Sequence, residues 1–211
     1  LRAAREAGVP FVLDLHENHP AAFEFWKRRP IEKLLFSAER AQRLEDASVA
    51  AADAVVVVVD EAKARLVART GDPERIAVFG NTEPLELAGA DAPPLPSGPL
   101  KMVYVGGLNF HRGLDVAVRA MPEILKTVPG AKLTIVGNGD VLEDLKAQAS
   151  KLGLGDSVTF TGLIPKDEAM NYVLEANLAL VPHYRSGHTD ATVQHKLFQY
   201  MSLARPVLVS D

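Results

Sequence analysis

The sequence of 211 residues contains no cysteine, which excludes a disulfide framework, a cysteine nucleophile and thiolate-bound zinc or iron–sulfur sites. It also lacks a basic excess, because 23 lysines and arginines stand against 27 aspartates and glutamates. Proteins dedicated to nucleic acids usually carry net positive charge. The longest uninterrupted apolar run, Ala54–Val59, is far too short to cross a bilayer. With 47% hydrophobic residues, the chain can nevertheless bury a sizeable core.

Two motifs that mark common enzyme classes are also absent. The chain has neither the G-x-x-x-x-G-K-[ST] loop of many phosphoryl-transfer enzymes nor the G-x-S-x-G turn of serine hydrolases. The common forms of both functions are therefore excluded, and the candidate chemistry has to come from other residues.

The chain does contain an alternation of short β-rich runs with amphipathic helical windows, which is typical of βα units in a parallel sheet. The strands predicted in this way cover residues 11–15, 54–59, 76–79, 101–105, 133–136, 158–161, 178–181 and 207–209. The valine run at 54–59 is apolar on both faces, as expected for a strand that helices cover on both sides.

Helices are predicted between these strands from apolar residues at helical spacing. One begins at Pro30, with Ile31, Leu34, Leu35 and Ala38 on one face, and one runs from an Asp60 cap to Gly71. The remaining helices cover residues 114–128, 141–152, 167–176 and 194–203.

Composition divides the chain into two halves. Residues 84–99 contain five of the fourteen prolines and neither lysine nor arginine, a composition typical of a linker. We therefore predict an α/β protein with two Rossmann-like domains, residues 1–83 and 100–211, each with a mostly parallel sheet between helices.

In such open sheets, ligands bind beyond the carboxyl ends of the strands. The turn after strand 101–105 carries Gly106 and Gly107, which let a ligand approach the backbone, and Arg112, whose guanidinium can face a phosphate. Taken alone, this turn fits an ordinary glycine turn with a surface arginine better than a ligand site.

The turn after strand 133–136 opens like a dinucleotide-binding motif, with Gly137 and Gly139. Leu142 stands where the third glycine is required, so the motif does not indicate NAD binding. A tight strand-to-helix turn near a ligand is the preferred interpretation.

Residues 182–201, PHYRSGHTDATVQHKLFQYM, join a polar loop to a helix. The loop contains His183, Arg185, His188, Thr189 and Asp190, and the first helical turn contains His195 and Lys196. Backbone N–H groups at a helix start favour an anion, and the lysine adds a full charge there. Gln199, one turn later, can reach a sugar hydroxyl. The histidines lack a familiar metal-ligand spacing, and a solvated loop with helix capping is the alternative.

In the first half, His16 follows the strand at 11–15 directly, where it can either hydrogen-bond a substrate or serve a structural role. His19 lies three residues further, which is not the H-E-x-x-H zinc pattern. Residues 23–29 mix aromatic and basic side chains, as membrane-surface segments do. Because Glu24 and Glu32 flank them, a solvated helix start is the preferred alternative.

Four segments of the second half occur in a specific order and spacing: YVGGLNFHRGLD, AKLTIVGNGD, SVTFTGLIP and HKLFQYMSLARPVLVSD. Together they resemble the donor half of a family-4 glycosyltransferase of the GT-B fold. FVLDLHENHP and VFGN in the first half agree more loosely. The resemblance implies a partial chain, lacking the first βα units of the acceptor domain and the closing helices of the donor domain. We therefore expect the 211-residue piece to be inactive by itself.

Enzymes of this family bind a nucleoside-diphosphate sugar between two domains and transfer the sugar with retention, without a metal ion or a further cofactor. The resemblance thus implies a hexosyltransferase with a glycan or lipid-linked acceptor and no nucleic-acid partner. It also implies a role in cell-envelope polysaccharide synthesis and a cytoplasmic location, either free or in peripheral contact with the inner face of the membrane.

The resemblance assigns site residues by their places in the motifs. The catalytic set is His16, Arg112 and Lys196. The donor-binding set is Gly106, Gly107, Gly137, Gly139, His188, Thr189, Asp190, His195 and Gln199.

Two departures from the family pattern stand out. Gly107 replaces a phosphate-binding arginine and Arg112 stands at the position of a lysine, so we expect Lys196 to supply part of the missing charge. The paired glutamates of the family fall on Ala191 and Gln199. A glutamine keeps an acceptor oxygen for the ribose but loses the charge, a difference of roughly 1 kcal/mol or more. The sugar contact of the first glutamate is then expected from residues 188–190.

Two alternatives stay open. Because both glutamates are absent, the protein can be a non-catalytic relative that binds a nucleotide or a carbohydrate. The third candidate is a GT-B sugar-nucleotide epimerase, which product analysis without an acceptor would distinguish. The transferase hypothesis requires the charges of Arg112 and Lys196 to gather around one diphosphate.

Overall fold

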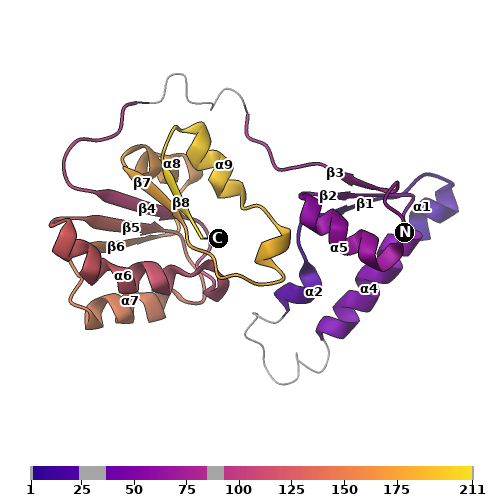
Figure 1. Cartoon of the computed structure of the whole chain (residues 1–211), viewed down its shortest axis with the longest axis horizontal. Coiled ribbons are helices and arrows are strands. Elements are labelled where there is room, and N and C mark those ends of the chain that lie inside the picture. Colours follow the sequence, from indigo (N-terminus) through magenta and orange to yellow (C-terminus); the bar gives the residue numbers. More distant parts are fainter. Residues whose placement is uncertain (1, 24–36, 85–92, 211) are drawn as a thin grey trace. The chain divides into compact units, whose positions relative to one another are not determined.

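The computed structural model describes residues 2–23, 37–84 and 93–210. These residues form two compact units (Figure 1). Unit 1 consists of Leu1–Asn81 and Arg185–Val193, and unit 2 consists of Thr82–Tyr184 and Gln194–Asp211. The predicted second domain began at residue 100 and continued without interruption, whereas in the structure residues 185–193 pack with the first unit.

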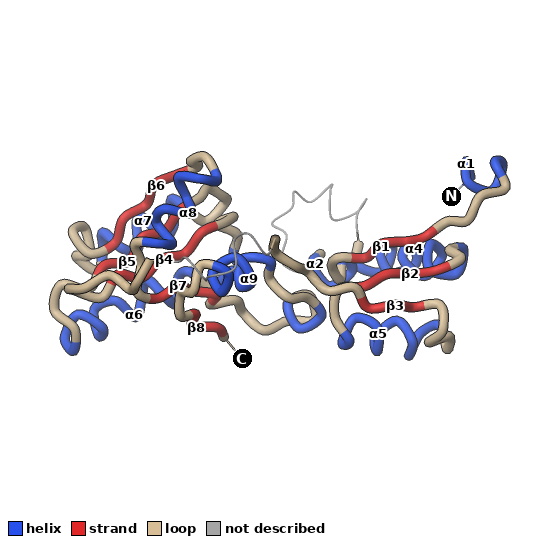
Figure 2. Tube along the Cα trace, turned by 90° about the horizontal axis from the view of Figure 1, so that it is seen from above, coloured by secondary structure: helices blue, strands red, loops and turns tan. Residues whose placement is uncertain are grey.

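Unit 1 contains a parallel sheet of β1 (Val12–Leu15), β2 (Ala54–Val57) and β3 (Ile76–Val78), with β2 in the centre (Figure 2). Its helices are α1 (Arg2–Ala7), α2 (His19–Ala22), α4 (Ala38–Ala51) and α5 (Asp60–Thr70). The valines of β2 are buried at Val55 and Val57 and pack with Leu66 of α5. The apolar run of the sequence thus forms the centre of this unit's core.

Unit 2 contains a five-stranded parallel sheet in the order β6-β5-β4-β7-β8. The strands are β4 (Lys101–Val105), β5 (Lys132–Val136), β6 (Val158–Gly162), β7 (Leu178–Val181) and β8 (Val207–Val209). The helices are α6 (Leu114–Thr127), α7 (Leu142–Lys151), α8 (Lys166–Leu174) and α9 (His195–Ser202).

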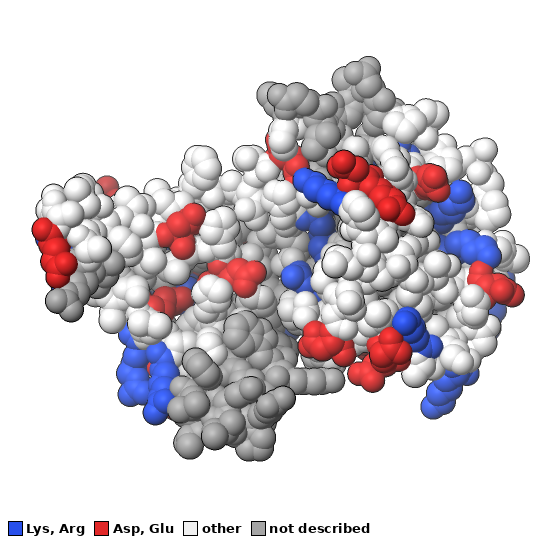
Figure 3. Space-filling model, turned by 180° about the vertical axis from the view of Figure 1, so that it is seen from behind, with Lys and Arg blue, Asp and Glu red and all other residues white. Residues whose placement is uncertain are grey.

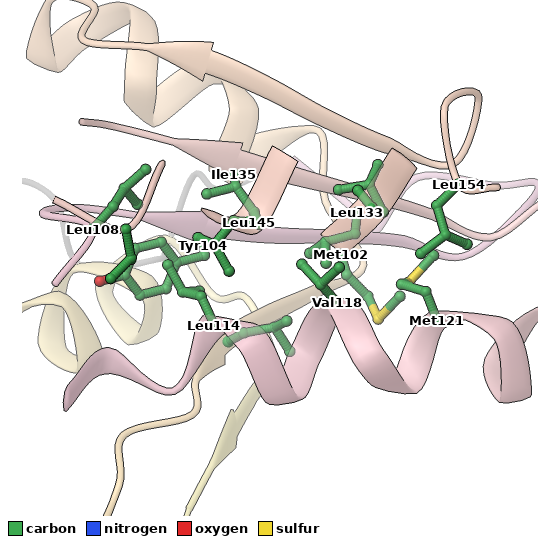
Figure 4. Packing of buried hydrophobic residues seen from close by; sticks show 14 residues of the cluster. Met102, Tyr104, Leu108, Leu114, Val118, Met121, Leu133, Ile135, Leu145 and Leu154 are labelled. Atoms are coloured by element: carbon green, nitrogen blue, oxygen red, sulfur yellow. The ribbon is translucent and has the colours of Figure 1, made fainter. Parts of the chain in front are cut away.

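Alternation along β4 gives unit 2 its three layers, because successive strand residues point to opposite faces of a sheet. Met102 and Tyr104 pack with the apolar stripes of α6 and α7, and Figure 4 shows Leu114 and Val118 of α6 pointing at this face. Val103 packs on the opposite face with residues of α8 and α9. The helix pairs therefore cover both faces, and the strand ends remain available for a site.

The structure confirms most of the predicted elements, including β4, β7 and β8 with their predicted bounds. The prediction that Asp60 caps α5 is wrong: Val59 occupies the cap position in extended backbone, and Asp60 lies in the first turn, where its charge favours the helix dipole. Gly71 ends this helix in the left-handed conformation, as predicted.

Three predictions fall wholly or partly outside the described residues. They are the helix predicted from Pro30, the aromatic and basic segment at 24–29, and the linker residues 85–92. Within the described ranges, no helix combines the length and the apolar character needed to span a membrane. On the face of unit 2 shown in Figure 3, acidic and basic side chains are intermixed, as the near balance of charges in the sequence predicts.

Candidate active site

The candidate site lies where the strand order of unit 2 reverses. The chain passes from β4 to β5 and β6 on one side, then returns to β7 and β8 on the other side of β4. Pairing between β4 and β7 ends at Val103 and Ala179. Beyond that point, the N–H of Val105 donates to the Tyr200 hydroxyl of α9, at 2.8 Å. Reversal points of this kind are where open α/β sheets bind ligands.

The loops that follow β4 and β7 are locked together. The N–H of Tyr184 donates to the carbonyl of His111 at 3.0 Å, and its ring stacks on Phe110 with centroids 5.4 Å apart. The Tyr184 hydroxyl donates to Asp115 of α6 at 2.6 Å. Gly113 permits this approach, because a Cβ there would lie 1.8 Å from the carbonyl oxygen of Pro182. Both loops therefore present fixed side chains at the same sheet edge.

Arg112, in the short 3₁₀ helix η2 (Phe110–Arg112), is held by two neutral side chains. Its Nη1 lies 2.7 Å from Nε2 of His183 and also donates to Oε1 of Gln194. Its Nε is buried without a hydrogen bond. Among the described residues, no carboxylate forms an ion pair with this guanidinium. Its charge therefore remains uncompensated.

Lys196, in the first turn of α9, presents a second uncompensated charge. Its Nζ is buried, makes no hydrogen bond within the described part of the chain and lies 3.8 Å from the centroid of the Tyr104 ring. The Tyr104 hydroxyl donates to the carbonyl of Gly107 at 2.8 Å, which fixes the ring. A Cβ at Gly106 would lie 2.8 Å from Nζ. The glycine turn after β4 thus makes room for a cation from α9.

The electrostatics of these groups follow from burial and from one another. Burial holds the pKa of Lys196 well below its ordinary value, and the charge of Arg112 lowers this pKa further. Burial likewise lowers the pKa of His183 to about 3, with contributions from Arg112, Lys196 and His111. A nearby anion would relieve this repulsion, since an opposite charge favours the protonated lysine.

Two helix starts add partial positive charge beside these side chains. The start of α6 follows Gly113, and that of α9 follows Gln194; neither has a side-chain hydrogen bond to its cap. Unsatisfied N–H groups in a first helical turn favour anions. The local chemistry therefore suits a negatively charged group such as a phosphate.

The predicted G-x-G turn has a clear packing role. A Cβ at Gly137 would lie 1.9 Å from the carbonyl oxygen of Gly106, and one at Gly139 would lie 2.3 Å from that of Leu108. The turn after β5 therefore contacts the turn after β4 through bare backbone and holds it in place.

The other predicted residues of α9 lie nearby in sequence but are more exposed. The side chain of His195 is 51% exposed, and its Nδ1 lies 3.1 Å from Oε1 of Glu83. Gln199 is half-buried one turn later. Unit 2 thus contains the predicted glycines, Arg112, Lys196 and these two α9 residues, and Lys196 lies against the turn at Gly106.

The remaining predicted residues, His16, His188, Thr189 and Asp190, belong to unit 1. His16 follows β1, its side chain is 61% exposed, and its Nε2 lies 3.0 Å from Oδ2 of Asp14. Its carbonyl accepts a hydrogen bond from Thr192 at 3.4 Å. Ala191, at the position of a family glutamate, is buried in the apolar core of this unit.

The sequence did not indicate Tyr104 or Gln194 as site residues, and it named His183 only as part of the polar loop before the helix at 194–203. His183 had a usable signal, because it comes two residues after β7 at the sheet edge that carries Arg112. Tyr104 and Gln194 gave no local signal, since an alternating strand residue and a helix-start residue are common. Across residues 2–23, 37–84 and 93–210, no group of three or more His, Asp or Glu side chains could hold a metal ion.

Comparison with known proteins gives a family match and curated relatives. The model of the family described as glycosyl transferases group 1 matches residues 90–211. The chain is 27% identical over 197 residues to a 2-deoxystreptamine glucosyltransferase of Streptomyces kanamyceticus, covering 85% of this chain and 48% of that protein. It is 39% identical over 81 residues to a GDP-mannose-dependent alpha-(1-6)-phosphatidylinositol monomannoside mannosyltransferase of Mycolicibacterium smegmatis, covering 38% of this chain and 21% of that protein. The chain thus spans about half or less of these relatives.

Solved structures show the same fold. A crystal structure of Anabaena HepE in complex with UDP-glucose superposes with a TM-score of 0.75 at 16% identity, over 99% of this chain and 55% of that chain. Likenesses of this kind confirm the predicted fold class, an α/β protein with Rossmann-like domains of the GT-B type.

Proposed function

Because the chain belongs to the family of glycosyl transferases group 1, we propose that the whole protein transfers a hexosyl group from a nucleoside-diphosphate sugar. The acceptor is a carbohydrate or a lipid-linked glycan, and the reaction retains the anomeric configuration without a metal ion. The names of two relatives agree with this substrate class, since one is a glucosyltransferase and the other depends on GDP-mannose.

The observation that carries the proposal is a pair of half-buried basic side chains, Arg112 and Lys196, for which the described residues supply no carboxylate partner. When the bond between the anomeric carbon and the diphosphate oxygen breaks, the electron pair stays on that oxygen. The charge of the leaving diphosphate therefore increases, and cations already fixed in place stabilise it without reorganisation. Arg112 and Lys196 supply this charge, and the starts of α6 and α9 add backbone N–H groups.

The other roles follow from the family resemblance. In the proposed complex, the backbone at Gly106 and Gly107 lies against the diphosphate, and Gln199 accepts a hydrogen bond from the ribose. His188, Thr189 and Asp190 contact the transferred sugar in place of a glutamate at Ala191, and His16 also faces this sugar. The proposal includes synthesis of cell-envelope polysaccharide in the cytoplasm or at the inner face of the membrane.

The test is calorimetric titration of this chain with UDP, GDP and ADP. We expect Arg112→Ala and Lys196→Met each to weaken binding of the preferred nucleotide about tenfold or more, since a hydrogen bond to a charged group contributes roughly 1.5–3 kcal/mol. Lys126→Ala is the matched control, because it removes a lysine that is 72% exposed on α6. Unchanged affinity in both site variants would overturn the diphosphate assignment.

Thermal unfolding separates a binding role from a structural one. Burial of Lys196 Nζ, which makes no hydrogen bond to the described residues, has an energetic cost in the empty protein. Lys196→Met is therefore expected to raise the unfolding temperature while it weakens nucleotide binding. A variant that lost both stability and affinity would indicate that Lys196 supports the fold instead.

A second candidate function is nucleotide binding without transfer, which the buried apolar position of Ala191 favours. Incubation of the whole protein with nucleotide sugars and acceptors distinguishes the candidates. A transferred sugar of unchanged anomeric configuration, formed equally in the presence of a chelator, supports the proposed function. Tight binding without turnover supports the second candidate, and an epimerised donor without acceptor indicates an epimerase.

A further inference from the structure

The two side chains that hold Arg112 are both neutral. His183 reaches it from the loop after β7, and Gln194 from the residue before α9. A carboxylate in either place would bind the guanidinium more strongly, since ionised partners make hydrogen bonds about twice as strong. It would also cancel the charge that an anionic ligand needs.

Hydrogen-bond chemistry fixes the state of His183. An arginine Nη1 only donates, so the Nε2 atom 2.7 Å away must accept, and the ring proton must lie on Nδ1. A protonated ring would have no acceptor to offer Arg112. His183 is 7% exposed. Burial and the neighbouring Arg112, Lys196 and His111 disfavour the protonated ring, and the backbone of Val181 acts in the opposite direction.

The backbone of His183 is also anchored. Its carbonyl accepts a hydrogen bond from the Ser210 hydroxyl at 2.6 Å, just beyond β8. The ring therefore projects from a backbone tied to the neighbouring strand end, and Arg112 meets an acceptor whose position is set by the sheet. Gln194 supplies the second acceptor from the start of the helix that carries Lys196.

We infer that His183 and Gln194 are positioning residues that aim Arg112 at the diphosphate of the donor without neutralising its charge. The inference rests on the proposed function for the identity of the anion. The state of His183 and the effect of charge at position 194 do not depend on that identity.

The first experiment changes the charge of an Arg112 partner while it keeps the shape of the side chain. Gln194→Glu keeps the side-chain shape and gives Arg112 an ion pair, so we expect equal or higher thermal stability and at least about tenfold weaker binding of the preferred nucleotide. His183→Leu removes one acceptor and is expected to weaken binding similarly, whereas His183→Gln restores an acceptor and most of the affinity. In an Arg112→Ala background, none of these changes should matter. Unaltered affinity in Gln194→Glu would overturn the inference.

The second experiment needs no ligand. Nitrogen NMR of the chain with isotope-labelled histidine reports which ring atom carries the proton. We expect His183 to remain neutral and protonated on Nδ1 between about pH 5 and 8, a range in which an ordinary histidine titrates. A proton on Nε2, or titration within this range, would overturn the inference whatever the ligand. If the NMR result holds and the whole protein binds no nucleoside diphosphate, the proposed function fails, whereas the hydrogen-bonded arrangement of His183, Gln194 and Arg112 stands.

Discussion

At the scale of single residues, the amino group of Lys196 packs against the face of the Tyr104 ring, whereas a carboxylate is its more usual partner. The attraction of an ammonium to a ring face contributes about 0.5–2 kcal/mol, less than burial of an unpaired charge removes. Tyr104 can hold this position because its hydroxyl is tied to Gly107 and its ring is fully buried. Burial therefore lowers the pKa of Lys196, and a bound anion would stabilise its protonated form.

Gly106 tests this arrangement directly. With φ at +141° and a Cβ position 2.8 Å from Nζ of Lys196, Gly106→Ala is expected to displace the ammonium from the ring. We predict roughly tenfold weaker nucleotide binding by calorimetry and a loss of about 1–3 kcal/mol in unfolding free energy from backbone strain.

The control for this prediction is Gly155→Ala, because a Cβ there would meet no atom within 4 Å. It should change neither quantity. If Gly106→Ala weakened binding equally in a Lys196→Met background, the loss would not act through Lys196, and the explanation would be wrong.

The sequence predicted the charged groups of this site better than their neutral partners. Arg112 and Lys196 carry formal charge next to glycine turns and helix starts, which is a local signal. His183 and Gln194 act through hydrogen bonds to a residue 71 and 82 positions away, respectively. Nothing in a local pattern specifies such a pair, since it depends on how two loops meet at the sheet edge.

At the scale of elements, periodicity predicted the strands and helices because each one buries a single, regular set of apolar positions. What periodicity could not show is how β4 and β7 separate at their carboxyl ends. Pairing ends at Val103, and the Tyr200 hydroxyl takes over the hydrogen bond of Val105. The Tyr200 side chain of α9 thus takes the place of a β7 backbone partner. This hydrogen bond keeps α9, and with it Lys196, next to β4.

Tyr200→Phe is therefore expected to destabilise the protein. Removing the hydroxyl leaves the part-buried N–H of Val105 without this acceptor, which costs about 1–3 kcal/mol. Denaturant unfolding measures this loss. Tyr172→Phe is the control, since Tyr172 packs against the same apolar cluster and makes no hydrogen bond within the described residues. An equal loss in both variants would contradict the assigned role of the hydroxyl.

At the scale of the whole molecule, the unexpected feature is the return of residues 185–193 to unit 1. Composition predicted the proline-rich linker but not this second passage, because the segment is polar and resembles any loop. Three hydrogen bonds anchor it: Asn18 donates to Gly187 at 2.8 Å, Asn81 to Val193 at 3.0 Å and Thr192 to His16 at 3.4 Å. Such bonds are long-range and leave no mark in the local sequence.

Asn18→Ala tests this anchoring. Asn18 is buried, caps α2 through Ala21 and holds Gly187, so its loss is expected to destabilise unit 1 by about 1–2 kcal/mol. Hydrogen exchange should become faster in residues 185–193. Asn171→Ala, at an exposed position of α8, is the control. Unchanged exchange in the segment would show that Asn18 does not anchor it.

The place of residues 185–193 in unit 1 affects the two residues that flank this segment in unit 2. The backbone passes between the units at 81/82, 184/185 and 193/194, and the last two passages adjoin His183 and Gln194. A displacement of residues 185–193 would therefore act through the backbone on His183 and Gln194, the two acceptors of Arg112, at the same time.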